Sequence, residues 1–219
     1  MDTLKQLLDI VLHLNTHLDT LVSDYGAWIY AILFLIVFCE TGLVVTPFLP
    51  GDSLLFAVGA LAAGGRLDLF LAMGLVFVAA VLGDTVNYSI GKYSGKQLIA
   101  KFPRLIKQKH LDQTHAFFER YGGKTIVIAR FVPIVRTLAP FVAGIGAMTY
   151  RRFMAYNVGG AVLWVGLITP AGYLFGQMPV VKKNFSLVIL GIIVVSTLPA
   201  VFEIYREWRR SKRDAGSGA

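Results

Sequence analysis

The sequence contains few charged residues for its length. Of its 219 residues, 16% are charged and 56% are hydrophobic, whereas a soluble domain is usually about a quarter charged. Long apolar runs cover residues 28–38, 69–82, 153–167 and 185–204. A bilayer core of about 30 Å needs roughly 20 apolar residues per helix. The length therefore allows one membrane domain with a handful of crossings and excludes a second globular domain.

Cysteine is almost absent, since Cys39 is the only one. This excludes an internal disulfide and a cysteine-rich metal site. The sequence also lacks a P-loop, a serine-hydrolase elbow and a zinc-binding helix motif. His13 and His17 are one helical turn apart and could form a metal-binding face, but histidines at a membrane interface are commoner. We therefore predict no metal site and no cofactor.

The net charge of +8 raises the possibility of a nucleic-acid partner. The basic residues flank apolar runs instead, as expected from membrane topology, so we expect no nucleic acid. Suppose that each long apolar run crosses the membrane and that each segment interrupted by proline and glycine re-enters it as a hairpin. Sixteen basic residues then lie on the side that holds 91–124, and three lie on the other. Cytoplasmic loops are enriched in Lys and Arg. We predict a multi-pass protein of the bacterial inner membrane with cytoplasmic N- and C-termini.

The chain divides into three parts by composition. Residues 1–25 carry leucines at helical spacing and predict an interfacial amphipathic helix rather than a cleavable signal peptide. Residues 26–205 form a membrane transport domain, and 206–219 form a basic cytoplasmic tail. Complete crossings are predicted at 28–46, 67–90, 152–175 and 185–205. The polar stretch 91–124 predicts one or two surface helices.

Prolines and glycines interrupt the apolar runs at two places. Pro47, Pro50 and Gly51 precede a segment, 53–63, that is too short to span. Pro133 and Pro140 interrupt the stretch 125–148. Each interrupted segment predicts a re-entrant helical hairpin, and the charge distribution makes the two hairpins opposed.

The two interrupted regions belong to an internal repeat. Its halves cover about 40–95 and 124–176, at an offset of 81 to 85 residues. Phe48-Leu49-Pro50 matches Phe131-Val132-Pro133, and the spaced glycines of 91–95 match those of 172–176, which could also serve a homodimer. Paired broken helices are typical of transporter sites. The predicted fold is an all-α membrane protein with about four transmembrane helices, two opposed re-entrant hairpins in an inverted repeat, and interfacial helices.

Five charged residues lie in or beside the apolar runs: Glu40, Asp52, Asp84, Arg130 and Arg136. Each charge costs roughly 2.5–3.5 kcal/mol at the centre of a membrane helix. They must therefore face a wet cavity or one another. Two convergent guanidinium groups suit a phosphate, although they could instead pair with the carboxylates to hold the hairpins together. Asp52 could be a helix N-cap, whereas Glu40 has no such role and suits a proton carrier.

Four motifs together resemble the DedA family, the bacterial relatives of eukaryotic membrane proteins of the Golgi and vacuole. They are Glu40-x-Gly42, Pro47 to Asp52, Gly83-Asp84 to Gly91, and Arg130 to Arg136. The resemblance runs from about residue 20 to 205. It implies lipid flippase or scramblase activity, with proton-linked transport of undecaprenyl phosphate or, in some members, of phosphatidylethanolamine. It also implies that Glu40, Asp52, Arg130 and Arg136 are functional.

We therefore predict a proton-coupled transporter that recycles undecaprenyl phosphate, a polyprenyl phosphate. Arg130 and Arg136 would bind the phosphate, and Glu40, Asp52 and Asp84 would serve as proton carriers or counter-ions. Two alternatives remain: a phosphatidylethanolamine flippase or scramblase, and a non-transporting scaffold for envelope homeostasis. A phosphatase is disfavoured, because the four histidines lie outside the predicted site.

Overall fold

The computed structural model describes residues 26–43, 51–101 and 108–179, with a few positions between 181 and 191. All regular structure in these residues is helical, which confirms the prediction of an all-α protein for this part of the chain. Several predicted features lie outside the described residues: the helix 1–25 with His13 and His17, the breaks at Pro47 and Pro50, most of the crossing 185–205, and the tail 206–219.

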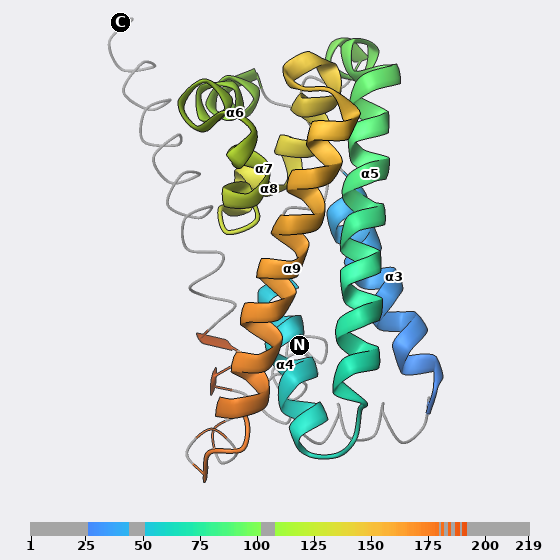
Figure 1. Ribbon diagram of the computed structural model, residues 1–219, viewed down its shortest axis with the longest axis vertical. Helices are drawn as coiled ribbons and strands as arrows, with labels where there is room; N and C mark the ends of the chain where they lie inside the picture. The colour runs from blue at the N-terminus through green and yellow to red at the C-terminus, as the bar shows by residue number, and fades with distance from the viewer. Residues whose placement is uncertain are drawn as a thin grey trace, which may run out of the picture.

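Two long antiparallel helices run the length of the molecule (Figure 1). They are α5 (Leu69–Lys101, 33 residues) and α9 (Tyr150–Phe175, 26 residues). Both contain windows that are long and apolar enough to cross a membrane. Helix α5 continues beyond Ile90, where a crossing was predicted to end, and its Gly91 and Gly95 pack against Phe141 and Ile145 of the interrupted stretch 125–148.

The first broken segment is a hairpin of α3 (Trp28–Gly42) and α4 (Gly51–Ala63). Helix α3 begins beside the start of α5, where the Asp68 backbone N–H donates to the Tyr30 hydroxyl at 2.8 Å. It ends at Gly42, against Gly83 in the middle of α5. Helix α4 then returns to the end from which α3 started (Figure 1).

Helix α3 is therefore shorter than the crossing predicted at 28–46, of which residues 44–46 lie outside the described part of the chain. Fifteen helical residues extend only about 22 Å at 1.5 Å per residue. The helix ends where the apolar run gives way to Glu40, Thr41 and Gly42, and these three are buried. Polar groups at mid-depth need partners that a continuing helix would not supply.

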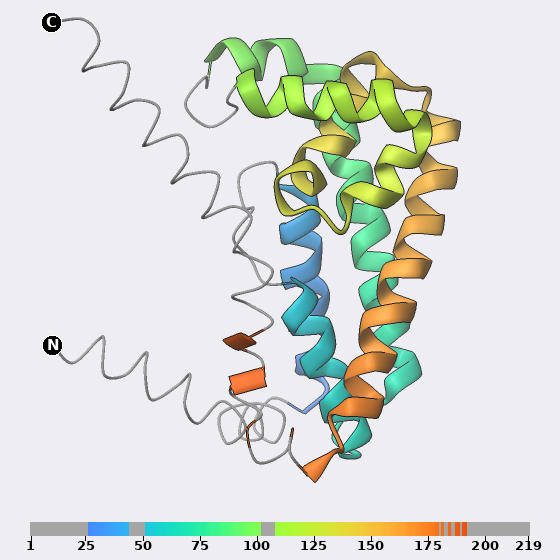
Figure 2. The ribbon, with the colours of Figure 1, turned by 90° about the vertical axis from the view of Figure 1, so that its left-hand side faces the viewer.

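The second broken segment enters from the opposite end. Helix α6 (Gln108–Tyr121) lies across that end (Figure 2). The short helices η1 (Gly122–Lys124) and α7 (Thr125–Ala129) follow, and α8 (Pro133–Val142) returns into the π-helical turn η2 (Ala143–Ala147). Pro133 opens α8 after an extended Val132, as a proline at the first position of a helix should.

Pro140 was predicted to break the chain, but it lies inside α8 and the helix continues past it. A proline removes only one backbone hydrogen bond, and a wider π turn follows three residues later. The actual reversal comes at Gly146, whose φ of +149° is open to glycine and strained for other residues.

The two halves of the repeat pack by exchanging arms. The first arm of each hairpin packs on the long helix of its own half, α3 on α5 and α7 on α9. The second arm packs on the long helix of the other half, α4 on α9 and α8 with η2 on α5. Each half thus contributes one hairpin arm to the long helix of the other half.

Four glycines make the exchanged contacts close. Gly59 and Gly172 lie where α4 meets α9, and Gly144 and Gly91 lie where η2 and α8 meet α5. A Cβ atom at any of them would collide with a backbone carbonyl of the facing helix. The carbonyls of Thr169 and Phe56 face Gly59 and Gly172, respectively. The carbonyls of Tyr88 and Phe141 face Gly144 and Gly91, respectively. The backbones therefore approach as closely as small residues in membrane helices allow.

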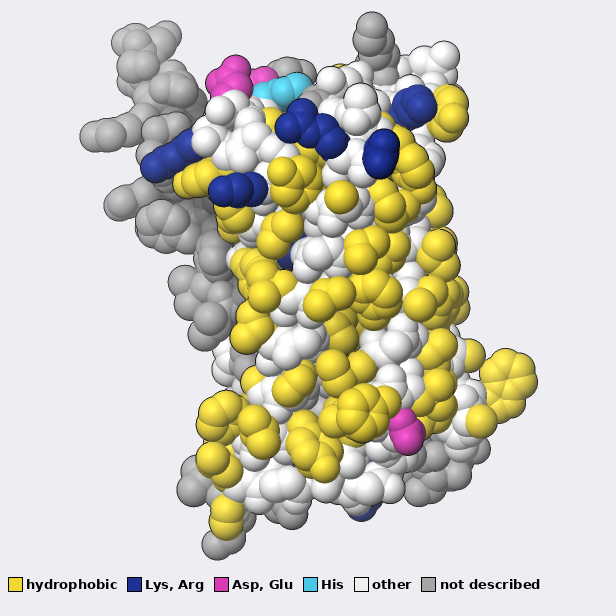
Figure 3. All heavy atoms as spheres, viewed as in Figure 1, with side chains coloured by type: hydrophobic (Ala, Val, Ile, Leu, Met, Phe, Trp, Pro, Cys, Tyr) yellow, Lys and Arg dark blue, Asp and Glu magenta, His cyan; other side chains and the backbone are white. Residues whose placement is uncertain are grey.

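The outer surface of the long helices is apolar, and positive charge gathers at one end (Figure 3). Exposed large side chains on this surface include Phe70, Val78, Leu163 and Leu167. The basic end carries α6 and the start of α9. This distribution matches a molecule whose middle faces lipid and whose ends face water.

Candidate functional site: a buried layer of charges

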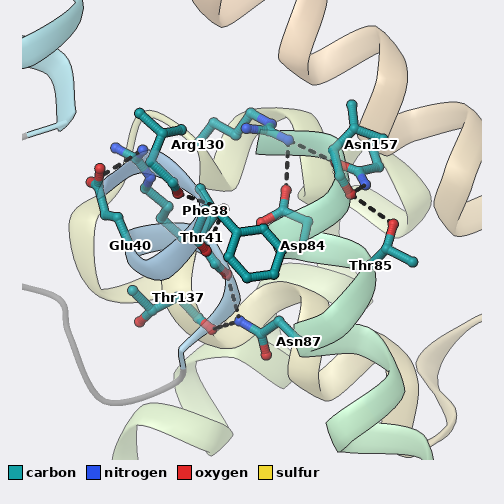
Figure 4. A network of polar contacts seen from close by, with 12 residues as sticks. Phe38, Glu40, Thr41, Asp84, Thr85, Asn87, Arg130, Thr137 and Asn157 are labelled. Atoms are coloured by element: carbon teal, nitrogen blue, oxygen red, sulfur yellow. Dashed lines mark hydrogen bonds and ion pairs between the residues drawn. The ribbon is translucent and has the colours of Figure 1, made fainter. Parts of the chain in front are cut away.

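The five charged residues singled out in the sequence lie in one layer, at the inner tips of the two hairpins. Glu40 comes from the end of α3 and Asp52 from the first turn of α4. Asp84 lies midway along α5, Arg130 directly follows α7, and Arg136 lies in α8. Figure 4 shows Glu40, Asp84 and Arg130 turned toward this shared interior. The layer is built by all five elements together.

Arg130 forms the most buried of the ion pairs. Its Nη2 lies 2.6 Å from Asp84 Oδ2, and the two side chains are 3% and 6% exposed. The same nitrogen donates to Asn157 Oδ1 at 2.7 Å, and Asn157 in turn donates to the Val81 carbonyl at 3.1 Å. Arg130 is thus fixed between α5 and α9 (Figure 4). In this conformation it is already neutralised and shielded from water.

Arg136 has a looser arrangement with two carboxylates. Its Nη2 lies 3.2 Å from Glu40 Oε1, and its Nη1 donates to Asp52 Oδ1 at 3.4 Å. Asp52 is the most accessible of the three, with its side chain 29% exposed, against 12% for Arg136 and 4% for Glu40. Long contacts at a partly exposed edge leave this guanidinium free to accept another anion.

Glu40 also binds the start of α4. Its Oε1 accepts the Gly51 backbone N–H at 3.2 Å, and any side chain at position 51 would collide with the Glu40 carboxyl. The expectation that Glu40 has no capping role is therefore wrong: it satisfies a free N–H at the N-terminus of another helix. Asp52 contacts Arg136 and the Trp164 indole N–H, the latter at 2.8 Å.

The layer contains polar atoms that lack a hydrogen-bond partner among the described residues. They are Glu40 Oε2, Asn87 Oδ1, Arg130 Nε and Arg136 Nη2. Native interiors satisfy nearly all such atoms. Two of the four belong to the Arg136–Glu40 pair, and both atoms are buried. This pair therefore has unused hydrogen-bonding capacity among the described residues.

Three further residues of the layer were missed by sequence reasoning: Asn87, Asn157 and Trp164. Asn87 Nδ2 donates to the carbonyls of Thr41 and Thr137, at 3.1 and 2.9 Å, and so ties the two hairpins together. An asparagine inside an apolar run was the available signal for both amides. Trp164 gave no signal, because a tryptophan is usual in a membrane helix. The described residues offer no cluster of three or more metal-ligating side chains.

The chain matches one protein-family model and several known membrane proteins. Residues 49–174 match the VTT domain model. The chain is 56% identical over 218 residues to Protein DedA of Escherichia coli K12, covering 98% of this chain and all of that protein. It is 43% identical over 183 residues to an uncharacterized membrane protein of Mycobacterium leprae, covering 83% and 82% of the two chains.

A more distant relative is the inner membrane protein YqjA of Escherichia coli K12. It is 36% identical over 156 residues, which cover 71% of each chain. No solved structure matches the chain.

Proposed function

Because this chain is a membrane protein of the DedA family and carries its VTT domain, we propose that it moves a lipid-linked phosphate across the bacterial inner membrane. The lipid is a polyprenyl phosphate such as undecaprenyl phosphate, and it travels from the outer to the inner leaflet. The isoprenoid tail stays in the bilayer, while the head group enters the layer of charges.

One observation carries the proposal: the loose, partly exposed site of Arg136. Its guanidinium faces Glu40 and Asp52 over contacts of 3.2 and 3.4 Å, and its Nη2 lacks an aligned acceptor among the described residues. A planar guanidinium binds a phosphate through two parallel N–H groups. Arg136 is therefore the first ligand of the head group, and its two carboxylates are the groups that the phosphate displaces.

Arg130 has a later role in the cycle. Asp84 and Asn157 occupy it in the present conformation, so it can reach a head group only after these contacts open. Each arginine lies at the tip of the second hairpin, on either side of Pro133. We infer that movement of this hairpin passes the phosphate from Arg136 to Arg130.

Proton coupling falls to Glu40. The Glu40 side chain is 4% exposed, and its Oε2 has no donor among the described residues. When a phosphate binds Arg136, Glu40 loses its cation in these buried surroundings. A proton on the carboxyl then replaces the lost charge. Departure of the phosphate returns Arg136 to Glu40 and releases the proton.

Opposed re-entrant hairpins provide the two entrances. The α3–α4 hairpin opens at one end of the molecule and the α7–α8 hairpin at the other, and both tips reach the charged layer. Figure 3 places the Lys and Arg side chains of the visible face mainly at the α6 end, and the positive-inside rule supports a cytoplasmic location for that end.

The test is transport by the purified protein in liposomes. Two labelled lipids are compared, a polyprenyl phosphate and phosphatidylethanolamine, with and without an imposed pH gradient. The proposal expects movement of the polyprenyl phosphate that exceeds protein-free liposomes and rises with the gradient. Movement of phosphatidylethanolamine alone would favour the second lipid, and movement of neither lipid by folded protein would favour a scaffold.

A further inference from the structure

Trp164 lies at the centre of the charged layer and has two kinds of contact there. Its side chain is fully buried in the middle of α9. One face belongs to an apolar cluster with Val37, Leu55 and Ala80. Its indole N–H, however, donates to Asp52 Oδ1 at 2.8 Å, and its ring centroid lies 4.3 Å from the Arg136 guanidinium and 5.8 Å from that of Arg130. A side chain that only filled the core would need the contact with the apolar cluster, but not the hydrogen bond to Asp52 or the contacts with the arginines.

The stacking contact with Arg136 does not use the N–H groups of the guanidinium. A guanidinium binds an aromatic ring through its flat face and binds oxygen atoms through its edge. At present the edge of Arg136 faces Glu40 and Asp52. An arriving phosphate can take over that edge while the face stays on the indole, so the ring can hold Arg136 in place during the exchange.

The indole N–H makes the two carboxylates unequal. Asp52 Oδ1 accepts from both Trp164 and Arg136, so it keeps one donor when Arg136 leaves. Glu40 keeps only the backbone N–H of Gly51 at Oε1 and has none at Oε2 among the described residues. The other charges in the layer, Asp84 and Arg130, are engaged with each other. Loss of Arg136 therefore affects Glu40 more than Asp52.

We propose that Trp164 is a positioning residue of the lipid-phosphate site. Its ring holds the Arg136 guanidinium, and its N–H stays hydrogen-bonded to Asp52 while the phosphate replaces the carboxylates on Arg136. The inference rests on the proposed function of the site. It assigns two separate roles to one side chain, and these can be separated by substitution.

The first experiment measures liposome transport against polyprenyl phosphate density for three variants. Trp164→Phe keeps a ring beneath Arg136 and loses the N–H, so it should lower the maximum rate about tenfold, as for a lost hydrogen bond to a charged group, with little change in half-saturation. Trp164→Leu also loses the ring and should raise the half-saturation density about tenfold. Trp28→Phe, at a 74% exposed tryptophan, is the matched control and should match wild type.

The second experiment needs no change at position 164. The chain has three tryptophans, at 28, 164 and 208. The Trp28→Phe/Trp208→Phe variant leaves Trp164 as the only tryptophan, and its emission is excited at a wavelength that the nine tyrosines do not absorb. Titration with a short-chain polyprenyl phosphate should change its emission in a saturable way. The corresponding polyprenol, which has no phosphate, should leave the emission unchanged.

The outcomes separate this inference from the proposed function. If wild type and Trp28→Phe transport the lipid, a folded Trp164→Phe that equals them in both parameters overturns the role of the N–H, and a folded Trp164→Leu that equals them overturns the role of the ring. Saturable transport without any emission change in the single-tryptophan variant would also overturn it. If wild type itself moves no lipid phosphate and Trp164 emission does not respond, the proposed function fails, and this inference fails with it.

Discussion

Arg136 faces two carboxylates with two different nitrogens, and this geometry distinguishes arginine from lysine. Arg136→Lys keeps the charge but cannot present two parallel N–H groups. We expect normal amounts of protein in the membrane and at least a tenfold loss of lipid phosphate transport, in line with a lost charge-assisted hydrogen bond of about 1.5–3 kcal/mol. Arg151→Lys, at an exposed position at the start of α9, is the control. Full activity of Arg136→Lys would show that Arg136 acts only through its positive charge.

Arg130 and Asp84 are so deeply buried that each should be costly to remove alone. Asp84→Asn leaves the Arg130 cation without its counter-ion, and breaking a buried pair typically costs about 3–5 kcal/mol. The double variant Arg130→Gln/Asp84→Asn removes both charges and should recover much of the thermal stability in detergent. It should not recover transport. A double variant as unstable as the single one would show that the pair is not the source of the loss.

Glu40 tests the link to protons. Glu40→Gln mimics the protonated carboxyl and can still accept the Gly51 N–H. It should therefore fold, bind the lipid phosphate at least as tightly as wild type, and lose transport driven by an imposed pH gradient. Binding and gradient-driven transport are measured side by side in the same liposomes. Transport equal to wild type would remove Glu40 from the mechanism and make Asp52 the next candidate.

Among the helices, the exchanged glycine contacts are the most sensitive to side-chain volume. Gly91→Ala and Gly172→Ala each place a methyl group against a backbone carbonyl, and overpacking of this kind costs about 1–3 kcal/mol or more. We expect less folded protein and a lower midpoint of thermal unfolding. Gly74→Ala on α5 and Gly166→Ala on α9 are matched controls, because nothing lies within 4 Å of a Cβ at either position. Equal effects at all four positions would contradict the close-contact explanation.

The sequence predicts the two long helices and the opposed broken segments because their signals are local. Apolar length identifies α5 and α9, and Pro133 identifies the interruption of 125–148. The extent of α3 was mispredicted, because hydrophobicity alone cannot distinguish an arm that ends at mid-depth from a complete crossing. That difference depends on what Glu40 meets, and its partner Arg136 lies 96 positions later in the chain.

The candidate site was predictable in its charges but not in its pairing. Five ionisable residues in apolar surroundings stand out in any membrane sequence. Which carboxylate meets which arginine depends on the exchange of hairpin arms, a tertiary feature. The bond from Trp164 to Asp52 joins residues 112 positions apart, and no local pattern predicts it.

For the molecule as a whole, charge distribution predicts orientation. In a Cys39→Ser background, a cysteine at Arg120 on α6 should be unreactive toward an impermeant thiol reagent in intact cells. A cysteine at Arg66, at the opposite end and exposed, should react. Permeabilised cells, in which both should react, provide the control. Labelling of position 120 from outside intact cells would reverse the proposed orientation.

The exchange of hairpin arms also affects how the protein is made. Helix α4 packs against α9, and Asp52 pairs with Arg136, which is 84 residues further along the chain. At synthesis rates of roughly 5–20 residues per second, Asp52 and Glu40 precede their arginine by on the order of 4 to 19 seconds. During that interval α4 lacks its packing surface on α9, and both carboxylates lack their counter-charge. The insertion machinery of the cell must therefore shelter an incomplete, negatively charged hairpin from lipid until the second half of the chain arrives.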